Sequence, residues 1–322
     1  MKIGLHEFRL DQDGDALAAL LSATRDKPVS RVDVAAMMQR DASLDDFRAL
    51  ITDDGTAYAR TFRQPWFTVG LYGTGVIVRP DVRRRGIGTW MLAAITDVGR
   101  TMGATAQISA VPDGRPEALE FALICGFVVD RHMSKSVVDP ASVDPGLLTA
   151  PLPEGITIAS LAALGDTEAN RRTLWKVSES IAIDFPNDRR QPRAYEQFAA
   201  QLLDVPGFRA AGAFVALDGK TWAGAAMVGY TAARNALYHH FTGVDPAYRG
   251  RGIATALRRA TIAYAIEIGA SILETNNDST NAPILAINRA FGYRSEPGVT
   301  DLYRTLAWSR PSASPGATDP VS

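Results

Sequence analysis

Two short glycine-rich turns, one in each half of the chain, have residue types and spacing that could bind phosphate. The later turn runs Val244-Asp-Pro-Ala-Tyr-Arg249-Gly-Arg-Gly252-Ile-Ala254, before apolar residues that recur at helical spacing up to Ile268. Glycines let the backbone approach a ligand closely, and a helix start offers unpaired N–H groups at the positive end of its dipole. The predicted diphosphate socket comprises Val244, Arg249, Gly250, Arg251, Gly252, Ile253 and Ala254.

The earlier turn repeats this pattern 166 positions upstream, as Arg83-x-x-Gly86-x-Gly88. The same offset relates Leu71-Tyr72 to Leu237-Tyr238 and Gly126 to Gly292. Because one ungapped register links these positions, the sequence indicates two copies of one domain. The residues of the first predicted socket are Val78, Arg83, Arg84, Arg85, Gly86, Ile87 and Gly88.

At these turns the sequence resembles the GCN5-related N-acetyltransferase (GNAT) family. Gly126-Phe127 and Gly292-Tyr293 lie where that family has a late Gly-Phe, and the two-copy plan is similar to that of mycothiol synthase and of biosynthetic and resistance acetyltransferases. The resemblance implies an α/β fold of two tandem domains, each a mixed, mostly antiparallel twisted sheet flanked by helices. It also implies that the turns hold the pyrophosphate of acetyl-CoA, with one cofactor in each domain if both turns are used.

Composition favours an ordinary globular protein. The 322 residues suffice for two domains with a core each, and the formal net charge of −1 favours neither nucleic acid nor an anionic membrane. No signal peptide, membrane span or metal-ligand set is predicted, and the single cysteine, Cys125, excludes an intrachain disulfide. The expected compartment is the cytoplasm. The oligomeric state is left open.

The repeat and a proline-rich stretch divide the chain. We expect a first domain at 1–138, a linker at 139–155, a second domain at 156–308 and a disordered tail at 309–322. In the first domain, helices are expected at 13–21, 32–40, 86–102 and 117–124, and strands within 1–10 and at 44–52, 56–62, 67–78, 104–111 and 127–138. In the second, helices are expected at 166–181, 194–203, 253–268 and 283–291, and strands at 210–217, 222–231, 237–244 and 272–275, near 293 and at 302–306.

The two copies differ in their asparagines. The second copy has Thr275-x-Asn277-x-x-x-Asn281 and, further on, Asn288, where the first copy has Ser109, Val111, Arg115 and Ala122. The resemblance implies that the later asparagine of this pattern bonds the pantetheine arm. The alternative is that Asn277 and Asn281 only cap a helix and satisfy a loop.

Histidines give a second contrast. Acetylation of an amine needs a group that removes a proton, and a histidine titrating near neutrality suits that task. His240 lies four residues before Val244, where the resemblance to serotonin-acetylating members implies such a base, and Thr74 stands at this position in the first copy. Strand alternation places Tyr238 on the same face as His240 and His239 on the other, where we expect a structural role. The alternative for His240 is a hydrogen-bonded core histidine.

One family feature is missing. Many members carry a tyrosine, four residues before the Gly-Phe, that protonates the leaving thiolate, and the residues there are Asn288 and Ala122. Either Tyr238, Tyr230 or solvent supplies the proton, or the site does not transfer acyl groups.

The sequence therefore predicts an N-acetyltransferase that moves acetyl from acetyl-CoA to a primary amine of a small molecule, with His240 and Tyr238 as catalytic residues. The first copy either binds acyl-CoA without turning it over or is a scaffold for the second. Two alternatives are a different donor (a longer acyl-CoA, a carrier-protein thioester or an aminoacyl-tRNA) and a non-catalytic acyl-CoA-binding protein. Aminoacyl-tRNA is the one nucleic-acid partner left open.

Overall fold

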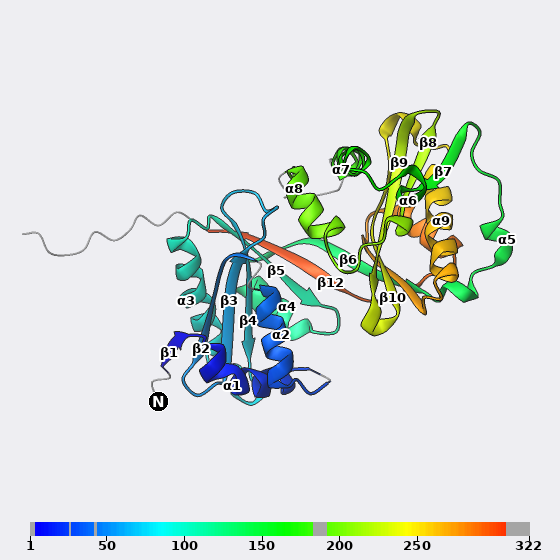
Figure 1. Cartoon of the computed structure of the whole chain (residues 1–322). Coiled ribbons are helices and arrows are strands. Elements are labelled where there is room, and N and C mark those ends of the chain that lie inside the picture. Colours follow the sequence, from blue (N-terminus) through cyan, green and yellow to red (C-terminus); the bar gives the residue numbers. More distant parts are fainter. Residues whose placement is uncertain (1–3, 26, 42–43, 183–191, 307–322) are drawn as a thin grey trace, which may run out of the picture. The chain divides into compact units, whose positions relative to one another are not determined.

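A computed structural model describes residues 4–25, 27–41, 44–182 and 192–306, and the predicted tail at 309–322 lies outside them. The chain forms two compact units (Figure 1). The first unit comprises Met1–Gln64, Val69–Ser109 and Tyr303–Ser322, and the second comprises Pro65–Thr68 and Ala110–Leu302. In both units a mostly antiparallel sheet is flanked by helices, which confirms the predicted fold class.

The first unit has the strand order β1-β2-β3-β4-β5, followed by the end of β12. Its pairs are antiparallel except β4 with β5, which is parallel. Helices α1 and α2 cover one face and α3 packs on β3 and β4. The elements are β1 (Leu5–Glu7), α1 (Leu10–Ser22), α2 (Arg31–Asp41), β2 (Asp45–Thr52), β3 (Ala57–Arg63), β4 (Leu71–Val78), η1 (Pro80–Val82), α3 (Ile87–Thr101) and β5 (Ala106–Pro112).

The second unit has the strand order β12-β6-β11-β10-β9-β8-β7, in which β10 and β11 are parallel. Its elements up to the end of β8 are α4 (Pro116–Ile124), β6 (Val128–Val138), η2 (Pro140–Ser142), α5 (Pro145–Leu148), β7 (Ile156–Ser160), α6 (Leu161–Leu164), α7 (Glu168–Ala182), α8 (Tyr195–Phe198), η3 (Ala199–Leu203), η4 (Ala210–Gly212) and β8 (Ala213–Asp218). The remainder are β9 (Thr221–Thr231), η5 (Ala232–Arg234), β10 (Ala236–Val244), η6 (Pro246–Tyr248), α9 (Ile253–Glu267), β11 (Ile272–Asp278), α10 (Ala282–Ala290) and β12 (Arg294–Thr305).

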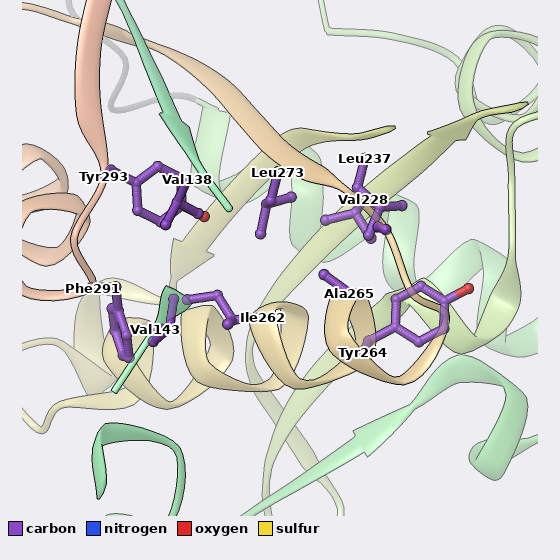
Figure 2. Packing of buried hydrophobic residues seen from close by; sticks show 11 residues of the cluster. Val138, Val143, Val228, Leu237, Ile262, Tyr264, Ala265, Leu273, Phe291 and Tyr293 are labelled. Carbon is purple, nitrogen blue, oxygen red and sulfur yellow. The ribbon is translucent and has the colours of Figure 1, made fainter. Parts of the chain in front are cut away.

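Both faces of the second sheet are buried by helices. On one face, apolar residues of α9 such as Ile262 and Ala265 pack on Leu237 of β10 and Leu273 of β11 (Figure 2). On the other, α7 and α8 pack on β8 and β9 through the cluster of Leu161, Leu174, Tyr195, Phe198, Leu203, Ala213, Ala225 and Met227. Burial of apolar area at about 25 cal/mol per Å² fixes the sheet between these helices. We call the two sides the α9 face and the α7 face.

The contact units do not follow the sequence repeat at two strands. Strand β6 ends the first repeat in the sequence, yet it pairs antiparallel with β11 of the second unit, from Leu273↔Val138 to Asp278↔Met133. Residues from Tyr303 onward, at the end of β12, belong to the first unit. The hydrophobic pattern of a strand does not state which edge it joins, so the sequence could not reveal this pairing.

Most predicted elements are present with ends shifted by a few residues. The strands expected near 293 and at 302–306 form one strand, β12, and the helix expected at 194–203 divides into α8 and a π-helical turn, η3. The proline-rich stretch is ordered against the second unit, because Val143 lies in its core and Arg259 of α9 donates to the Ala150 carbonyl.

Candidate functional site

Strands β10 and β11 separate and leave an opening in the sheet of the second unit. They pair only from Ala236↔Ile272 to Tyr238↔Glu274. Beyond that point β10 stays with β9 as far as Val244, and β11 stays with β6 as far as Asp278. The edges of β10 and β11 that face each other therefore have backbone groups that no strand pairs, and such groups can bind an extended ligand.

The glycine-rich turn joins β10 to α9 at the mouth of this opening. Gly250 and Gly252 have φ of 76° and 79°, a region in which residues with a side chain are strained. An added Cβ at Gly250 would meet no atom within 4 Å, so the space over the backbone is free. Helix α9 has no side-chain cap at Gly252, which leaves the first N–H groups available to an anion.

The arginines of this turn have structural partners. The Nε atom of Arg249 donates to the Val244 carbonyl at 3.2 Å, which ties the turn to the end of the strand. Arg251 donates to the Glu154 carbonyl at 3.0 Å and lies 3.7 Å from Asp218. Ile253 is 1% exposed and packs in the core, so its backbone N–H, like that of Ala254, is what it can offer a ligand.

The turn of the first unit has the same construction. Arg83 donates through Nε to the Val78 carbonyl at 3.0 Å, as Arg249 does to Val244. Arg84 and Gly86 have φ of 64° and 83°, the same pair of left-handed positions. Helix α3 again begins without a side-chain cap, with Ile87 buried and Gly88 in its first turn, and Arg85 donates to the Asp81 carbonyl at 3.4 Å. Strands β4 and β5 also separate, after Gly73↔Ile108.

A β-bulge on β10 lies at His240. His239 pairs with Val228 and Phe241 with Met227, so His240 is an extra residue without a partner on β9. Its ring lies edge-on to Tyr238, with centroids 5.3 Å apart, which confirms that these two side chains share a face. Phe241 packs in the cluster on the α7 face, so the bulge gathers three aromatic rings on that side.

The His240 imidazole is neutral at pH 7. Its side chain is exposed, yet the surrounding protein desolvates the ring and Arg193 repels its charged form, and together they lower the pKa to about 4. A neutral ring has a lone pair that can accept a proton. The pKa of Tyr238 is raised, mainly by burial, so its hydroxyl keeps its proton and can donate one.

His239 points to the α9 face, as strand alternation predicted. It is 2% exposed, and Arg258 of α9 donates to its Nδ1 at 2.6 Å. Because a guanidinium only donates, the ring proton lies on Nε2, which faces the Thr242 hydroxyl at 2.5 Å. Burial is the main cause that lowers the pKa of His239 well below its usual value, with Arg258 next.

The three predicted asparagines lie beside the opening. Asn288 of α10 is 2% exposed and donates from Nδ2 to Oδ1 of Asn277 on β11 at 2.9 Å. Asn281 caps α10, where its side chain accepts from the Ile284 N–H at 3.4 Å. This cap is the alternative that sequence reasoning left open for Asn281, and no described residue bonds the amide nitrogen of that side chain.

Several residues near His240 were not predicted from the sequence. Glu179 of α7 and Arg193 form an ion pair at 2.8 Å with side chains 18% and 12% exposed. Glu274, opposite Tyr238 in the strand register, binds Arg234 and Lys135. Burial opposes ionisation of Glu274, but the hydrogen bonds from Arg234 and Lys135 prevail and lower its pKa. No local motif marks these residues, because each comes from a different segment.

A cavity of about 410 Å³ lies elsewhere, between β7, the start of β8 and α9, with Ser160, Phe214 and Glu267 in its lining. None of its lining residues belongs to the β10–β11 opening, and strand geometry marks the opening better than cavity size. Within the described residues, no group of histidine, cysteine, aspartate or glutamate side chains has the geometry to hold a metal ion. No helix among them has the length and apolar character needed to cross a membrane.

Comparison with known proteins agrees with this architecture. The family model described as Acetyltransferase (GNAT) family matches residues 19–127 and 174–293, one match in each repeat and more than half of the chain. The chain therefore belongs to the GNAT acetyltransferase family, and its tandem organisation is confirmed. A search of curated proteins gave no match.

Solved structures share the tandem fold. A GCN5-related N-acetyltransferase from Sphaerobacter thermophilus has a TM-score of 0.74 at 19% identity, over 94% of this chain and 95% of that one. A tandem GNAT protein from the clavulanic acid biosynthesis pathway has a TM-score of 0.68 at 18% identity, over 96% and 100%. A glucosamine N-acetyltransferase region of a fungal multi-domain β-N-acetylglucosaminidase has a TM-score of 0.71 at 15% identity, over 94% and 38%.

Proposed function

We propose that the second unit transfers an acetyl group from acetyl-CoA to a primary amine of a small molecule. One observation carries this proposal: a single opening between β10 and β11 has the glycine-rich turn at its mouth and a neutral histidine near its vertex. The vertex is the point after Tyr238 and Glu274 where the two strands separate. A donor with a diphosphate at one end and a thioester at the other fits that order. Structural neighbours named for clavulanic acid biosynthesis and for glucosamine acetylation are compatible with a small acceptor.

The proposed donor site uses the backbone of the turn. N–H groups from Gly250 to Ala254 bind the diphosphate, and Arg249 keeps the turn attached to Val244. The pantetheine arm then lies along the unpaired edge of β10, as an added strand would. Asn277, Asn281 and Asn288 border the arm on the β11 side, where the free Nδ2 of Asn281 donates to it.

The proposed reaction is direct attack by the amine. His240 takes a proton from the ammonium, directly or through water, and the free amine attacks the thioester carbonyl. Unpaired N–H groups of β10 stabilise the resulting oxyanion, because they are fixed before the charge develops. Tyr238 lies beside His240 on the α7 face, from which the acceptor approaches, and its protonated hydroxyl orients the amine.

The first unit is proposed to bind a second acetyl-CoA without turning it over. Its turn has the same left-handed positions and the same uncapped helix start as the turn of the second unit. Arg83 donates to the Val78 carbonyl there, as Arg249 does to the Val244 carbonyl. It has no bulge and no histidine on β4, which pairs with β3 in unbroken register. Arg84 and Arg85 add positive charge beside that socket, which favours an anionic ligand.

The test is calorimetric titration of acetyl-CoA into the wild type, Gly252→Asp and Gly86→Asp. Aspartate at these left-handed positions adds a negative charge where the diphosphate would lie. Two sites in the wild type, each lost with its own variant, would support both binding proposals. One site lost only in Gly252→Asp would restrict acetyl-CoA to the second unit. An absence of binding in the wild type would reject acetyl-CoA as the donor.

A further inference from the structure

A buried positive charge lies beneath the vertex of the opening, on the face opposite to His240. The Arg258 side chain is 1% exposed, and its guanidinium reaches from α9 to His239, the first residue of β10 beyond the last β10–β11 pair. The hydroxyl of Thr275, the first residue of β11 beyond its pairs with β10, donates to the His239 carbonyl at 3.4 Å. Arg258 is thus held where the strands begin to separate.

No described carboxylate neutralises this charge. Among the described residues, the partners of the Arg258 guanidinium are neutral: the His239 ring, and the Tyr293 ring, whose centre lies 5.4 Å from the central carbon of the guanidinium. A guanidinium stays protonated, and a buried charge without a counter-ion is costly, so folds seldom keep one by chance. Three buried polar atoms have no hydrogen bond of good geometry among the described residues: Arg258 Nε, Tyr293 Oη and Asn288 Oδ1. The Tyr293 hydroxyl still lies near enough to Arg258 that the guanidinium opposes the rise that burial causes in the tyrosine pKa.

The first repeat has no such charge at the equivalent positions. At the offset of 166 residues, Arg258 corresponds to Leu92, Asn288 to Ala122 and Tyr293 to Phe127. All three residues of the first repeat are buried and apolar. Polar residues at these three positions are therefore not a requirement of the repeat. The arginine on the α3 side of the first unit, Arg304, comes from another strand and is hydrogen-bonded to Thr96 and Gln107.

We propose that Arg258 stabilises the thiolate that leaves when the thioester is cleaved, so that the thiolate departs without receiving a proton. This inference rests on the function proposed above. The amine nitrogen forms a bond to the carbonyl carbon, the carbon–sulfur bond breaks, and its electron pair stays on sulfur. The ammonium loses one proton before the attack, and the nitrogen loses a second as the carbon–sulfur bond breaks. Both protons leave through His240 to solvent, and the thiolate is protonated only after release.

Position and charge both support this role. The amine and its base are on the α7 face, whereas the donor arm starts at α9, so sulfur departs toward the face that holds Arg258. The charged or titratable groups around the vertex are His239 and Tyr293 on the α9 face, and Tyr238, His240, Glu274 and the Glu179–Arg193 ion pair on the other. Glu274 is bound by Arg234 and Lys135, so Arg258 is the cation without a described counter-ion at the vertex. Its field in a poorly hydrated site is stronger than in water.

The experiment measures the acidity of the thiol of bound CoA, which needs no acceptor. CoA is titrated with pH while the ultraviolet absorbance of its thiolate is followed, in a Gly86→Asp, Cys125→Ser background. This background confines binding to the second unit and removes the chain's own thiol. The variants are Arg258→Met, Arg258→Lys and, as a matched control on the same helix, Arg259→Met.

The expected result is a thiol pKa at least about one unit lower when CoA is bound than when it is free, a tenfold gain in thiolate. Arg258→Met should lose this shift, while Arg258→Lys and Arg259→Met should keep most of it. A bound thiol that titrates like free CoA would overturn the inference, as would an unchanged shift in folded Arg258→Met. If Arg258→Met does not fold, the wild type and Arg258→Lys still decide, because a shift absent from both overturns the inference.

Calorimetry on the same samples separates the two proposals. Absence of CoA binding to the second unit would reject the proposed function and this inference together. Binding with an unshifted thiol would reject only the role of Arg258.

Discussion

Strands β4 and β10 occupy the same place in the two units, yet only β10 contains a bulge. In β4 the register with β3 is continuous from Ala57↔Val78 to Phe62↔Gly73. In β10 the register with β9 shifts between His239 and Phe241. One extra residue reverses the faces of every side chain before it, because strand side chains alternate.

The repeated Leu-Tyr pair shows the effect of this reversal. The Tyr72 hydroxyl donates to the Met102 carbonyl at the end of α3, at 2.7 Å. Tyr238 is its partner in the sequence repeat, but it lies on the opposite, α7 face beside His240. Thr74, which the sequence aligned with His240, lies opposite Thr61 against α3 and corresponds in register to His239. His240 therefore has no counterpart in the first unit, and the aligned threonine was a wrong equivalent.

Near the bulge, the glycine and the large ring that lies against it are on opposite strands in the two units. In the first unit the Phe62 ring of β3 lies against Gly73 of β4. In the second unit the glycine is on the neighbouring strand, Gly229 of β9, and the His240 ring lies against it. The space that a phenylalanine fills in one unit thus holds the candidate base in the other, which is why we place the chemistry in the second unit.

Removing His240 should have the largest effect on turnover. Deleting it leaves His239 opposite Val228 and Phe241 opposite Met227, so the sheet should persist as a regular ladder. The deletion and His240→Ala should each lower turnover about a hundredfold, because a positioned general base contributes at least that much. Steady-state kinetics and acetyl-CoA titration would check this, with affinity expected to change little. The control is Thr74→Ala, and full activity in either His240 variant would remove the bulge from the mechanism.

Gly229→Ala should have a smaller effect in the same direction. A Cβ on Gly229 would overlap Nε2 of His240 and displace the ring from its position. We expect turnover to fall about tenfold, since small misplacements of a catalytic group are costly. Gly75→Ala is the matched control, because its Cβ would make only ordinary contact with Arg60 at 3.9 Å. Equal activity of the two variants would contradict a role for His240 position.

Acid should weaken the second unit relative to the first. The folded-state pKa of His239 is lowered mainly by burial and that of His240 is lowered to about 4, so the unfolded chain binds more protons between pH 6.5 and 4. Stability from these groups is therefore lost as pH falls through that window. In the first unit, hydrogen bonds that His6 donates to Asp53 and Asp13 raise the pKa of His6, which acts in the opposite direction.

Hydrogen exchange at pH 7.5 and 5, corrected for intrinsic rates, would measure this difference. Protection of β10 should fall by about tenfold relative to β2 and β3. His240→Asn should reduce the difference, and equal changes in both units would contradict the assignment of neutral histidines.

Removing the hydrogen bonds that Arg249 and Arg83 donate to the strand ends should have the smallest effect. The loss of stability should be equal in the two units. Arg249→Met and Arg83→Met each lose a bond to the carbonyl of Val244 or Val78, worth about 1 kcal/mol at a half-exposed site. Melting temperatures should fall by about 2–4 °C in either case. A much larger loss in one unit would show that the turns are not equivalent.

The features that could be predicted from the sequence are those marked by the repeat, by residue spacing or by strand alternation. Both turns, most helices and strands, the tandem plan and the shared face of Tyr238 and His240 followed from spacing and alternation. The bulge did not, because no residue in His239-His240-Phe241 marks an extra position. The Glu179–Arg193 pair and the Arg258–His239 contact were also hidden, since each joins distant segments through the folded sheet.

The two strands that do not follow the sequence repeat, β6 and the end of β12, constrain the order of folding. β6 pairs with a strand that ends at Asp278, and the first unit includes residues from Tyr303 onward at the end of β12. On a ribosome, the first repeat leaves the exit tunnel long before those partners are synthesised. Contacts between residues so far apart in sequence form slowly, since loop closure precedes any gain from pairing. The strand pairing of the first repeat can therefore be completed only when nearly the whole chain has been made.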